Sequence, residues 1–470
     1  MSDIIRALSI HEASFPVYAE LVPGGGNIVV CLRLQGDLSA EQAQQGLINL
    51  MQAEASLQVA CQWLQPKTSE QGEKQPEDYY FVKVEQAVPF EALSIENPSD
   101  FESSIDDMRT RLLNQPFKLG SLLWRARLIS QDQQHCLLLC INHSVSDGTS
   151  VYHLLKRWLL ALNSSTKITA TANELGLPLW HYMPKKISGF LGAFRSLGIL
   201  STFMKAQKLA DQGLHFKVAH NVPIMEHRCQ STFRILEPES FTRLLASATK
   251  HNNSLHGLLS SAMLNVLLTD CKKQGRLENL KQNFSIPFVT TVNVRNRISP
   301  IVDDSVAGCL SSGVTSMVNI DQSCIDNDYQ KSPWALGEQI AGGVKDALDQ
   351  EQHWKVLRIY KLAGLKGLKK MFIDSSEKPL ATPISFANLG PVSFDYYINR
   401  ANESNHNPLI VTGYEAYAAF HASGAGINIV GSTLKGALTL CLTSPDPVVS
   451  QQTLNEYADA VVELLQQWAQ

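Results

Sequence analysis

Apolar and polar positions follow two different periods in the first part of the chain, one typical of strands and one typical of helices. Short apolar runs predict strands at residues 27–35, 79–84, 122–129 and 134–142. Apolar residues at helical spacing predict helices at residues 39–53, 101–113 and about 149–162. Ser39 is a candidate N-cap for the first of these helices. The run at 134–142 is nearly continuous in apolar residues, which predicts a strand buried on both faces of a sheet.

The second part of the chain repeats this mixed pattern. Helices are predicted at residues 238–250, 255–272 and about 450–468. Strands are predicted at residues 284–294, 308–317, 383–387, 410–420, 426–433 and 435–443. Residues 164–225 are less regular, hold several prolines and include the apolar segment 187–204, so we interpret them as the link between two halves. The sequence therefore predicts mixed α/β structure, with one domain at 1–185, a connecting segment at 186–225 and a second domain at 226–470.

Composition and charge narrow the function classes. Hydrophobic residues make up 44% of the chain, which is ample for a large core, and the formal net charge is -4. No arginine-rich arm or zinc-finger spacing is present, so we expect no nucleic-acid partner. The nine cysteines include no CxxC pair, which argues against a structural metal site and suits a reducing compartment. Because the sequence shows neither a signal-peptide pattern nor a run of about 20 apolar residues, we expect a cytoplasmic protein.

The most informative segment is NHSVSDG at residues 142–148, where a buried apolar strand runs directly into His143. Polar side chains at such strand ends lie where α/β folds bind ligands, and imidazole is the usual general base near neutral pH. Asp147 can turn back in the loop to brace the backbone or to meet a distant arginine. We expect Gly148 to permit the backbone angles of that turn. The two serines of the segment lack the GxSxG surroundings of a nucleophilic serine.

Each of these residues, taken alone, also has a structural interpretation. A histidine at a strand end is more often a hydrogen-bonded structural residue than a catalytic base. Asn388 can be a turn residue before Gly390 and Pro391. His421, which stands close to glycines, is interpreted as structural.

The segment NHSVSDG resembles the HHxxxDG signature of the condensation-type acyltransferases. This superfamily includes the condensation domains of peptide synthetases, the plant BAHD enzymes, the mycobacterial polyketide-associated acyltransferases and the alcohol acetyltransferases. Asn142 replaces the first histidine of the signature, which plant members also lack. Further resemblances follow in the family's order: RALSIHEASF at 6–15, QPFKLGSLLWRARLI at 115–129, TTVNVRNR at 290–297 and SFANLGPV at 385–392. A lone HxxxD pattern is weak, whereas matches in this order are specific.

The resemblance implies a pseudo-dimer of two chloramphenicol-acetyltransferase-like domains, with a tunnel between them and the catalytic histidine inside it. His143 inherits the role of that histidine. Asp147 is then expected to pair with Arg295, with Arg297 as the alternative partner, and, together with Gly148, to support the loop. The Gly148 amide and the Asn388 side chain are candidate donors to the oxyanion, and Asn142 is a candidate contact with the acceptor substrate.

The implied reaction transfers an acyl group, other than an aminoacyl group, from a thioester to an alcohol or amine, with no acyl-enzyme. The thioester would be a co-substrate built on coenzyme A or phosphopantetheine, an acyl carrier protein is a candidate partner, and no metal or other cofactor is expected. Two alternatives stay open: a free-standing condensation domain that forms an amide in trans, and a catalytically silent binding protein of the same fold.

One further segment bears on partners. Residues 355–370 (KVLRIYKLAGLKGLKK) hold six positive charges and no acid. Leu357, Tyr360, Leu365 and Leu368 are expected to form an apolar side. We interpret the segment either as a solvated helix packed on its domain or as a contact with a membrane surface, an acidic carrier protein or the phosphates of coenzyme A.

Overall fold

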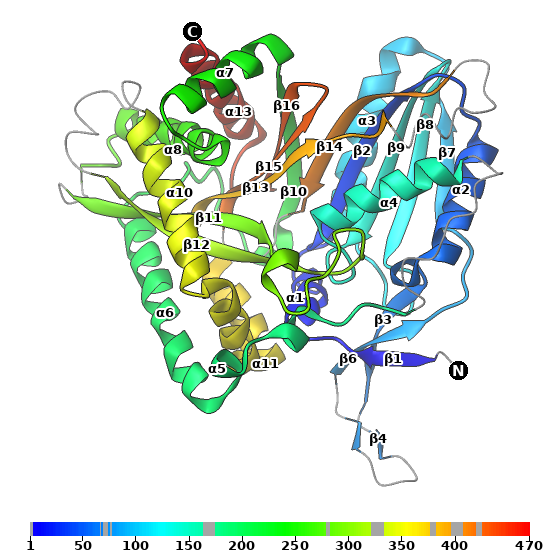
Figure 1. Ribbon diagram of the computed structural model, residues 1–470, viewed down its shortest axis with the longest axis horizontal. Coiled ribbons are helices and arrows are strands. Elements are labelled where there is room, and N and C mark those ends of the chain that lie inside the picture. The colour runs from blue at the N-terminus through cyan, green and yellow to red at the C-terminus, as the bar shows by residue number, and fades with distance from the viewer. Residues whose placement is uncertain are drawn as a thin grey trace.

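The computed structural model describes residues 3–65, 67–68, 74–75, 78–162, 174–278, 283–320, 333–376, 382–395, 408–419 and 425–470. Figure 1 shows two mixed α/β halves side by side, each built around one large sheet. In one half the sheet has five strands in the order β14-β2-β9-β8-β7. In the other half it has six, in the order β10-β16-β15-β13-β11-β12. Both sheets contain parallel and antiparallel pairs, so the predicted fold class is confirmed.

The five-stranded sheet forms where the apolar runs predicted it. Its central strand β9 (Gln134–Asn142) is antiparallel to β2 (Asn27–Gln35) on one side and to β8 (Trp124–Gln131) on the other. The edge strand β7 (Phe90–Ser94) lies beside β8 in the sheet and runs parallel to it. Because side chains alternate between faces, β9 buries one set against α3 (Phe101–Asn114) and the other against the core under α4 (Gly148–Ala161). The prediction of a strand buried on both faces is confirmed.

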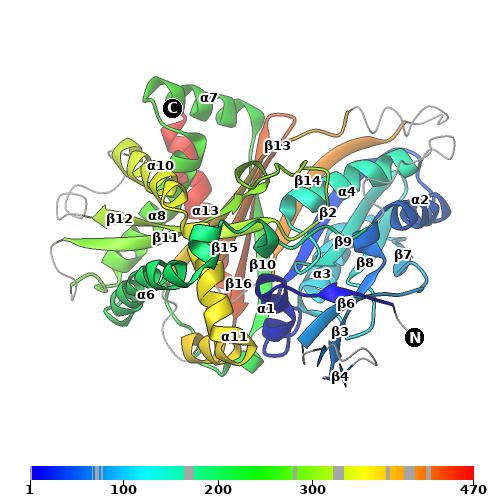
Figure 2. The same cartoon turned by 60° about the horizontal axis from the view of Figure 1, so that its bottom comes forward.

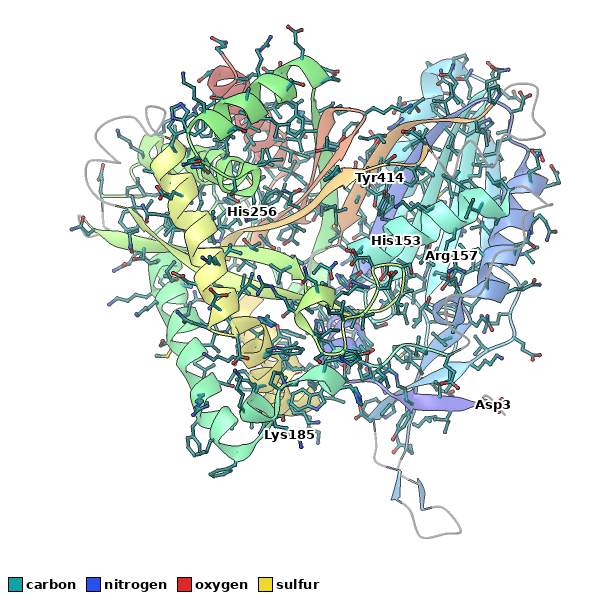
Figure 3. All side chains as sticks on the ribbon, viewed as in Figure 1. Asp3, His153, Arg157, Lys185, His256 and Tyr414 are labelled. Carbon is teal, nitrogen blue, oxygen red and sulfur yellow. The ribbon has the colours of Figure 1, made fainter. Side chains whose placement is uncertain are left out.

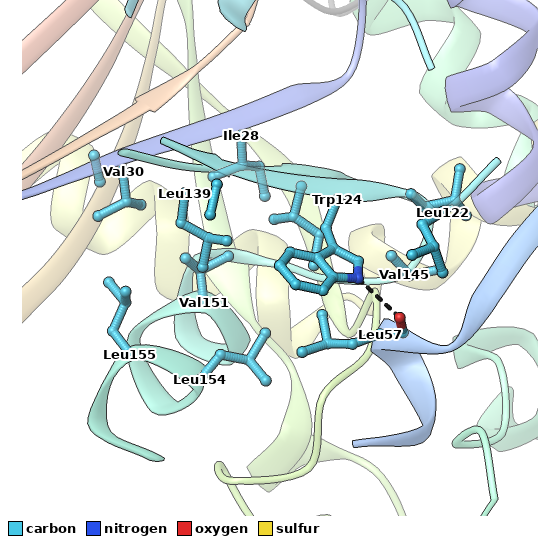
Figure 4. Packing of buried hydrophobic residues seen from close by; sticks show 14 of the residues in the cluster. Ile28, Val30, Leu57, Leu122, Trp124, Leu139, Val145, Val151, Leu154 and Leu155 are labelled. Carbon is cyan, nitrogen blue, oxygen red and sulfur yellow. Dashed lines mark hydrogen bonds between the residues drawn. The ribbon is translucent and has the colours of Figure 1, made fainter. Parts of the chain in front are cut away.

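The core between this sheet and α4 is close-packed around one tryptophan. Trp124 lies among aliphatic side chains of the sheet and of α4, and its indole nitrogen donates to the carbonyl oxygen of Leu57 at 2.8 Å (Figure 4). On the outer side of α4 lies α2 (Ala40–Ala53), whose N-cap is Ser39, as predicted. A fixed α4 matters for the site because it begins directly after the NHSVSDG loop.

A strand from the second half completes the first sheet. Residues Ile410–Ala418 form β14, which pairs in antiparallel register with β2, so that Tyr414 lies opposite Leu32. The predicted domain boundaries remain a prediction. Residues 226–470 build the second half and also contribute β14 to the sheet of the first half. The crossing strand joins the halves through backbone hydrogen bonds, which holds the surfaces between them in a fixed relation.

The six-stranded sheet carries the second core. Its strands are β10 (Arg228–Leu236), β11 (Phe284–Asn293), β12 (Ser311–Ile320), β13 (Thr382–Val392), β15 (Ala425–Leu434) and β16 (Ala437–Asp446). The helices of this half are α7 (Pro238–Lys250), α8 (Leu255–Lys273), α10 (Pro333–Asp349) and α13 (Gln451–Trp468). Residues of α8 and α13 dominate its core, and α8 is buried on nearly all sides. This is why its sequence is apolar all round rather than striped.

Figure 2 shows the remaining elements spread from one side of the molecule to the other. Strands β1 (Ile4–Ala7), β6 (Asp78–Lys83) and β3 (Val59–Leu64) form a small sheet, and β4 (Lys67–Thr68) pairs with β5 (Lys74–Gln75). Helix α1 (Ile10–Ala19) packs against α11 (Gln352–Ser376). The connecting segment contains α5 (Lys185–Ser188) and the long helix α6 (Phe190–Asp211), which also packs against α11. No helix in the described ranges is long and apolar enough to cross a bilayer.

Candidate active site

His143 lies in the short loop between the end of β9 and the start of α4. The loop is fixed at its first residue, because Asn142 Oδ1 accepts from the Ser144 amide at 3.0 Å. The backbone amide of His143 donates to the carbonyl oxygen of Gly26 at 2.8 Å, which ties the loop to the glycine-rich turn before β2. Such a side-chain-to-backbone turn needs a side-chain acceptor close to the backbone, which the amide oxygen of Asn142 supplies. Asn142 thus shapes the loop from a buried position.

The imidazole of His143 is held between an aromatic ring and a thiol. The Phe15 ring stacks on it with centroids 4.6 Å apart, and Cys309 Sγ lies 3.8 Å from Nδ1. Burial lowers the pKa of His143 below its ordinary value of 6.5. The Asp147 charge and the backbone acceptors at His143 and Ser146 act in the opposite direction but do not outweigh burial. The ring is therefore neutral near pH 7 and can accept a proton.

Asp147 is the N-cap of α4 and connects the two halves. Its Oδ1 accepts from the amide and the hydroxyl of Ser150, both at 2.9 Å. Its Oδ2 accepts from Arg295 Nη1 at 2.8 Å and from the Leu310 amide at 2.9 Å. Burial acts to raise the pKa of Asp147, but the charge and the hydrogen bond of Arg295 outweigh it, and the pKa is lowered. Both oxygens are thus occupied by the loop and the second half.

The predicted ion pair between Asp147 and Arg295 is present and almost fully buried, with 2% and 1% of the side chains exposed. The guanidinium also donates to Ser150 Oγ at 2.8 Å and to the carbonyl oxygen of Val306 at 3.1 Å. A buried charge pair of this kind is stable only when its other hydrogen-bonding positions are filled, as they largely are here. The pair locks the loop that carries His143 onto the segment before β12.

Gly148 serves a different purpose from the one the sequence suggested. It is the first residue of α4 and has helical rather than left-handed backbone angles, so the expectation that it supplies special turn angles is wrong. A Cβ at this position would lie 2.8 Å from Leu389 Cδ2 on β13. The glycine therefore permits a close approach of α4 to the second half.

His143 faces a cavity of about 200 Å³ between the two halves. From the first half the cavity is lined by α1, the glycine-rich turn and the NHSVSDG loop; from the second by α11 and strands β11, β12, β13 and β15. Its polar side chains outside the His143 loop include Thr291, Ser311, Thr315, Ser385 and Asn428. Most of its remaining wall is apolar. This combination suits a ligand with an apolar body and a reactive polar centre.

A second histidine, His11, lines this cavity, and no motif in the sequence predicts a role for it. His11 lies in the first turn of α1, whose start is fixed by a reciprocal capping box between Ser9 and Glu12. Burial lowers the pKa of His11 to about 3, and the neighbouring His143 lowers it further. The Asp147 charge acts to raise this pKa but does not outweigh them. Cys309 Sγ lies 3.7 Å from His11 Nδ1 and so stands between the two imidazoles. Burial raises the pKa of this thiol, which therefore stays protonated.

The only sequence signal for His11 was that it lies within RALSIHEASF. That resemblance concerns the segment as a whole and does not single out His11 as a site residue. Cys309 comes 166 positions after His143, and only the packing of the halves brings them together. The cavity serines and threonines alternate along strands like ordinary solvent-facing residues, so their pattern carries no functional signal.

The structure does not bring Asn388 into the cavity. Ala387 lines the cavity, and the side chain of the next residue along β13 points to the opposite face. Asn388 Oδ1 accepts from the Gly390 amide at 2.9 Å, which is a turn contact. Asn142 is likewise outside the residues that line this cavity. His421 lies outside the described residues.

The basic segment 355–370 forms part of α11, and the apolar side expected there faces inward. Leu357 and Leu368 are buried, and Tyr360 lines the cavity. Four of its cations have partners: Lys361 and Arg358 lie 4.4 and 5.8 Å from the Trp180 ring centroid, and Lys369 and Lys370 pair with Glu20 at 2.7 Å and with Asp374 at 3.2 Å. The segment is thus a helix packed on its domain. Among the residues that the structure describes, no group of three or more side chains is arranged to hold a metal ion.

No protein-family model matches the sequence, and no curated protein matches it. The fold, in contrast, resembles several solved structures over nearly their whole length. A trichothecene 15-O-acetyltransferase from Fusarium sporotrichioides superposes with a TM-score of 0.71 at 12% identity, over 98% of this chain and 95% of that one. The first condensation domain of the calcium-dependent antibiotic synthetase gives 0.69 at 14%, over 100% and 97%.

Polyketide synthase associated protein 5 from Mycobacterium tuberculosis gives a TM-score of 0.61 at 14% identity, over 100% of this chain and 98% of that one. At these identities the likeness establishes the fold. The chain has the two-halved fold of condensation domains and of this acetyltransferase, as the sequence resemblance implied.

Proposed function

We propose that this protein is an acyltransferase that moves an acyl group from a thioester to a hydroxyl or amine, with His143 as the general base. The observation that carries the proposal is the position of a neutral, buried imidazole on the wall of a cavity between the halves. The fold supports it, because it is shared with proteins named as an acetyltransferase and as condensation domains.

The proton balance of the reaction follows from this position. His143 accepts the proton of the acceptor hydroxyl or amine as that atom attacks the thioester carbonyl. The carbon–sulfur bond then breaks, the new ester or amide bond remains, and the imidazolium returns its proton to the departing thiolate. Two nearby contacts assist the base. Phe15 fixes the plane of the His143 ring, and the neutral Cys309 thiol adds no negative charge that would raise the pKa of His143. No acyl-enzyme is needed.

The oxyanion needs donors in the same cavity. The Asn388 side chain faces away from it, so we assign this role to the hydroxyl groups of β11 and β12 instead, with Thr291 and Ser311 as the first candidates. The Gly148 amide remains a second candidate from the first turn of α4. Asp147 and Arg295 act as positioning residues, because they contact the loop and not the cavity.

Coenzyme A or phosphopantetheine is the proposed thiol carrier, and an acyl carrier protein is the proposed partner in the second case. Some proteins of this fold are named as domains of synthetases or as polyketide synthase associated, which supports a carrier-bound donor. An amine acceptor would make the protein a free-standing condensation enzyme with the same chemistry. We place it in the cytoplasm, where such thioesters are made.

The test is acyl transfer from a panel of acyl-coenzyme A and acyl-pantetheine thioesters to alcohols and amines, read as thiol release and product mass. His143→Ala should reduce turnover by about 10²–10⁴-fold while circular dichroism and the unfolding midpoint stay native. The matched control is His220→Ala, which removes an exposed imidazole outside the cavity and should leave turnover unchanged. Equal activity of wild type and His143→Ala on every substrate that turns over would show that His143 is not the general base, and binding of thioesters without any turnover by the wild type would show that the protein only binds its ligands.

A further inference from the structure

The outward face of α6 is apolar although no described part of the molecule covers it. Phe190, Phe194 and Met204 are 77%, 61% and 72% exposed. With Leu197 they recur at helical spacing, so they form one stripe along the helix. The opposite face holds the small and buried residues Gly192, Ser196, Ile199, Ala206 and Ala210. A soluble helix normally reverses this arrangement of large apolar residues, so the stripe marks a contact surface.

The same segment is positively charged throughout. From Lys185 to Asp211 the chain has Lys185, Lys186, Arg195, Lys205 and Lys208, and its one acidic residue, Asp211, ends α6. Among the residues that the structure describes, only Lys186 of these five has an acidic partner, Glu351. Two cations lie in α5, directly before the stripe, and two lie at its far end. Figure 3 shows Lys185 on the lower side of the molecule, at the start of α5.

Helix α6 also reaches the candidate active site, through the face opposite the stripe. Phe203, on the same helix as Met204, is 38% exposed and also lines the cavity that His143 faces. The helix packs against α11 and touches β11 and β13, which form the cavity wall in the second half. One helix therefore carries the exposed apolar stripe on its outer face and part of the cavity wall on its inner face.

We propose that α6 lies in the plane of an anionic lipid surface and delivers a lipid-borne substrate to the cavity. At 1.5 Å per residue the 22 residues of α6 extend over about 33 Å, so a helix lying in the plane of the surface would contact it along this whole length. No helix in the described residues is long and apolar enough to cross a bilayer. Exposed Phe, Leu and Met residues enter the interface while lysines and the arginine meet anionic headgroups. An acidic protein would match the cations but not the apolar centre of the stripe.

Vesicle flotation tests this placement with the full-length protein. Phosphatidylcholine vesicles with and without phosphatidylglycerol are mixed with wild type, with Phe190→Ser/Phe194→Ser and with Lys205→Glu/Lys208→Glu. The phenylalanine variant should lose at least ~10-fold in partitioning to anionic vesicles, because two rings no longer enter the interface. The lysine variant should lose a similar factor on phosphatidylglycerol vesicles and show little change on pure phosphatidylcholine.

Matched controls carry the same changes elsewhere. Leu119→Ser/Met225→Ser removes two exposed apolar side chains, and Lys250→Glu/Lys345→Glu reverses two exposed charges outside α6. Both should bind vesicles like the wild type. If controls and α6 variants lose binding equally, or if none of the proteins floats, the proposal is wrong. Binding of an acidic holo-carrier protein that depends on Phe190 and Phe194, without vesicle binding, would assign the surface to a protein partner instead.

The delivery step rests on the proposed acyl transfer, and a second assay separates the two. Phe190→Ser/Phe194→Ser should turn over a water-soluble short acyl thioester like the wild type, since neither residue lines the cavity. With the substrate embedded in anionic vesicles its rate should fall by the factor lost in partitioning. Loss of both reactions in His143→Ala with intact flotation would support the base and the surface independently. Flotation without any acyl transfer by wild type would overturn the proposed function alone.

Discussion

The carboxylate of Asp147 and the guanidinium of Arg295 meet across the two halves of the chain, with Oδ2 and Nη1 2.8 Å apart and both side chains almost fully buried. Neither group lines the cavity that His143 faces. The pair instead fixes the N-terminus of α4 and the residues before β12, and Leu310 donates its amide to the same carboxylate oxygen. It is a positioning device for the His143 loop.

Asp147→Ala should destabilise the fold by about 3–5 kcal/mol, because it leaves a buried guanidinium without its counter-ion. Arg295→Ala should cost a similar amount, for the converse reason. The double variant should cost clearly less than the sum, since the second change then removes no intact pair. Urea unfolding of the four proteins measures the coupling energy. Simple additivity in stability and in kcat would contradict the positioning role of the pair.

The pH profile of acyl transfer should reflect a histidine whose pKa is lowered. Because burial lowers the pKa of His143 below its ordinary value of 6.5, the acidic limb of kcat/KM should be centred below pH 6.5. The measurement is kcat/KM against pH with a water-soluble thioester. An acidic limb centred above 6.5 would show that the ring is not desolvated in the working enzyme.

His11 should make the stability of the fold sensitive to acid. Its pKa in the folded protein is about 3, so the unfolded chain binds a proton at this residue below pH 6.5 that the folded chain does not bind. Stability should therefore fall as the pH drops from 6.5 towards 3, by about 2 kcal/mol at about pH 5 from this group alone.

His11→Asn should remove that part of the acid loss, as measured by urea unfolding at neutral and acid pH. Exposed His220→Asn is the control and should retain the wild-type dependence on pH. If both variants lose stability with acid as the wild type does, His11 is hydrated and its place on the cavity wall is wrong.

Asn142→His, which restores the first histidine of the signature that the segment resembles, should change activity little. The side chain of Asn142 shapes the loop through the Ser144 amide and does not line the cavity. Asn142→Ala should instead destabilise the protein by about 1–3 kcal/mol, because that buried amide loses its acceptor. Loss of nearly all turnover in a folded Asn142→His protein would mean that Asn142 contacts a substrate directly.

The local pattern of apolar residues predicted most strands and helices of the first half. The elements and pairings that it could not predict have identifiable physical reasons. The strand that ends at His143 was predictable because continuous apolar residues leave few other placements. Strand β14 was placed correctly along the chain, but no local pattern says that it pairs with β2 rather than with a strand of its own half. The length of α6 was missed because it is apolar on two sides, which obscures the helical period.

The site divides in the same way. His143, Asp147 and Arg295 follow from motifs; a buried carboxylate needs a counter-ion, and the family resemblance is what points to Arg295 as that counter-ion. His11 and Cys309 could not be predicted, since their contact with His143 arises only when α1 and the segment before β12 pack against its loop. For Gly148 the sequence suggested the wrong reason. A glycine next to a turn suggested a need for unusual backbone angles, whereas the structure shows that Leu389 packs too close to leave room for a Cβ.

Gly26 gives the sharpest test of how the His143 ring is held. Its φ is +78°, and a Cβ there would lie 2.8 Å from Phe15 Cδ1, the ring that stacks on His143. Gly120 has the same φ of +78°, but a Cβ there would have no neighbour within 4 Å. Alanine at either position therefore costs about 1–2 kcal/mol of backbone strain, and only at Gly26 does it also displace an aromatic ring.

Gly26→Ala should consequently lower kcat and shift the acidic limb of the pH profile towards 6.5, because a displaced Phe15 exposes the imidazole to water. Gly120→Ala should lose comparable stability and keep both kcat and the limb of the wild type. Stability is measured by urea unfolding, and the limb by kcat/KM against pH. If the two variants have the same pH profile, stacking on Phe15 does not set the state of His143, and the pKa of the base must depend on the rest of the cavity wall.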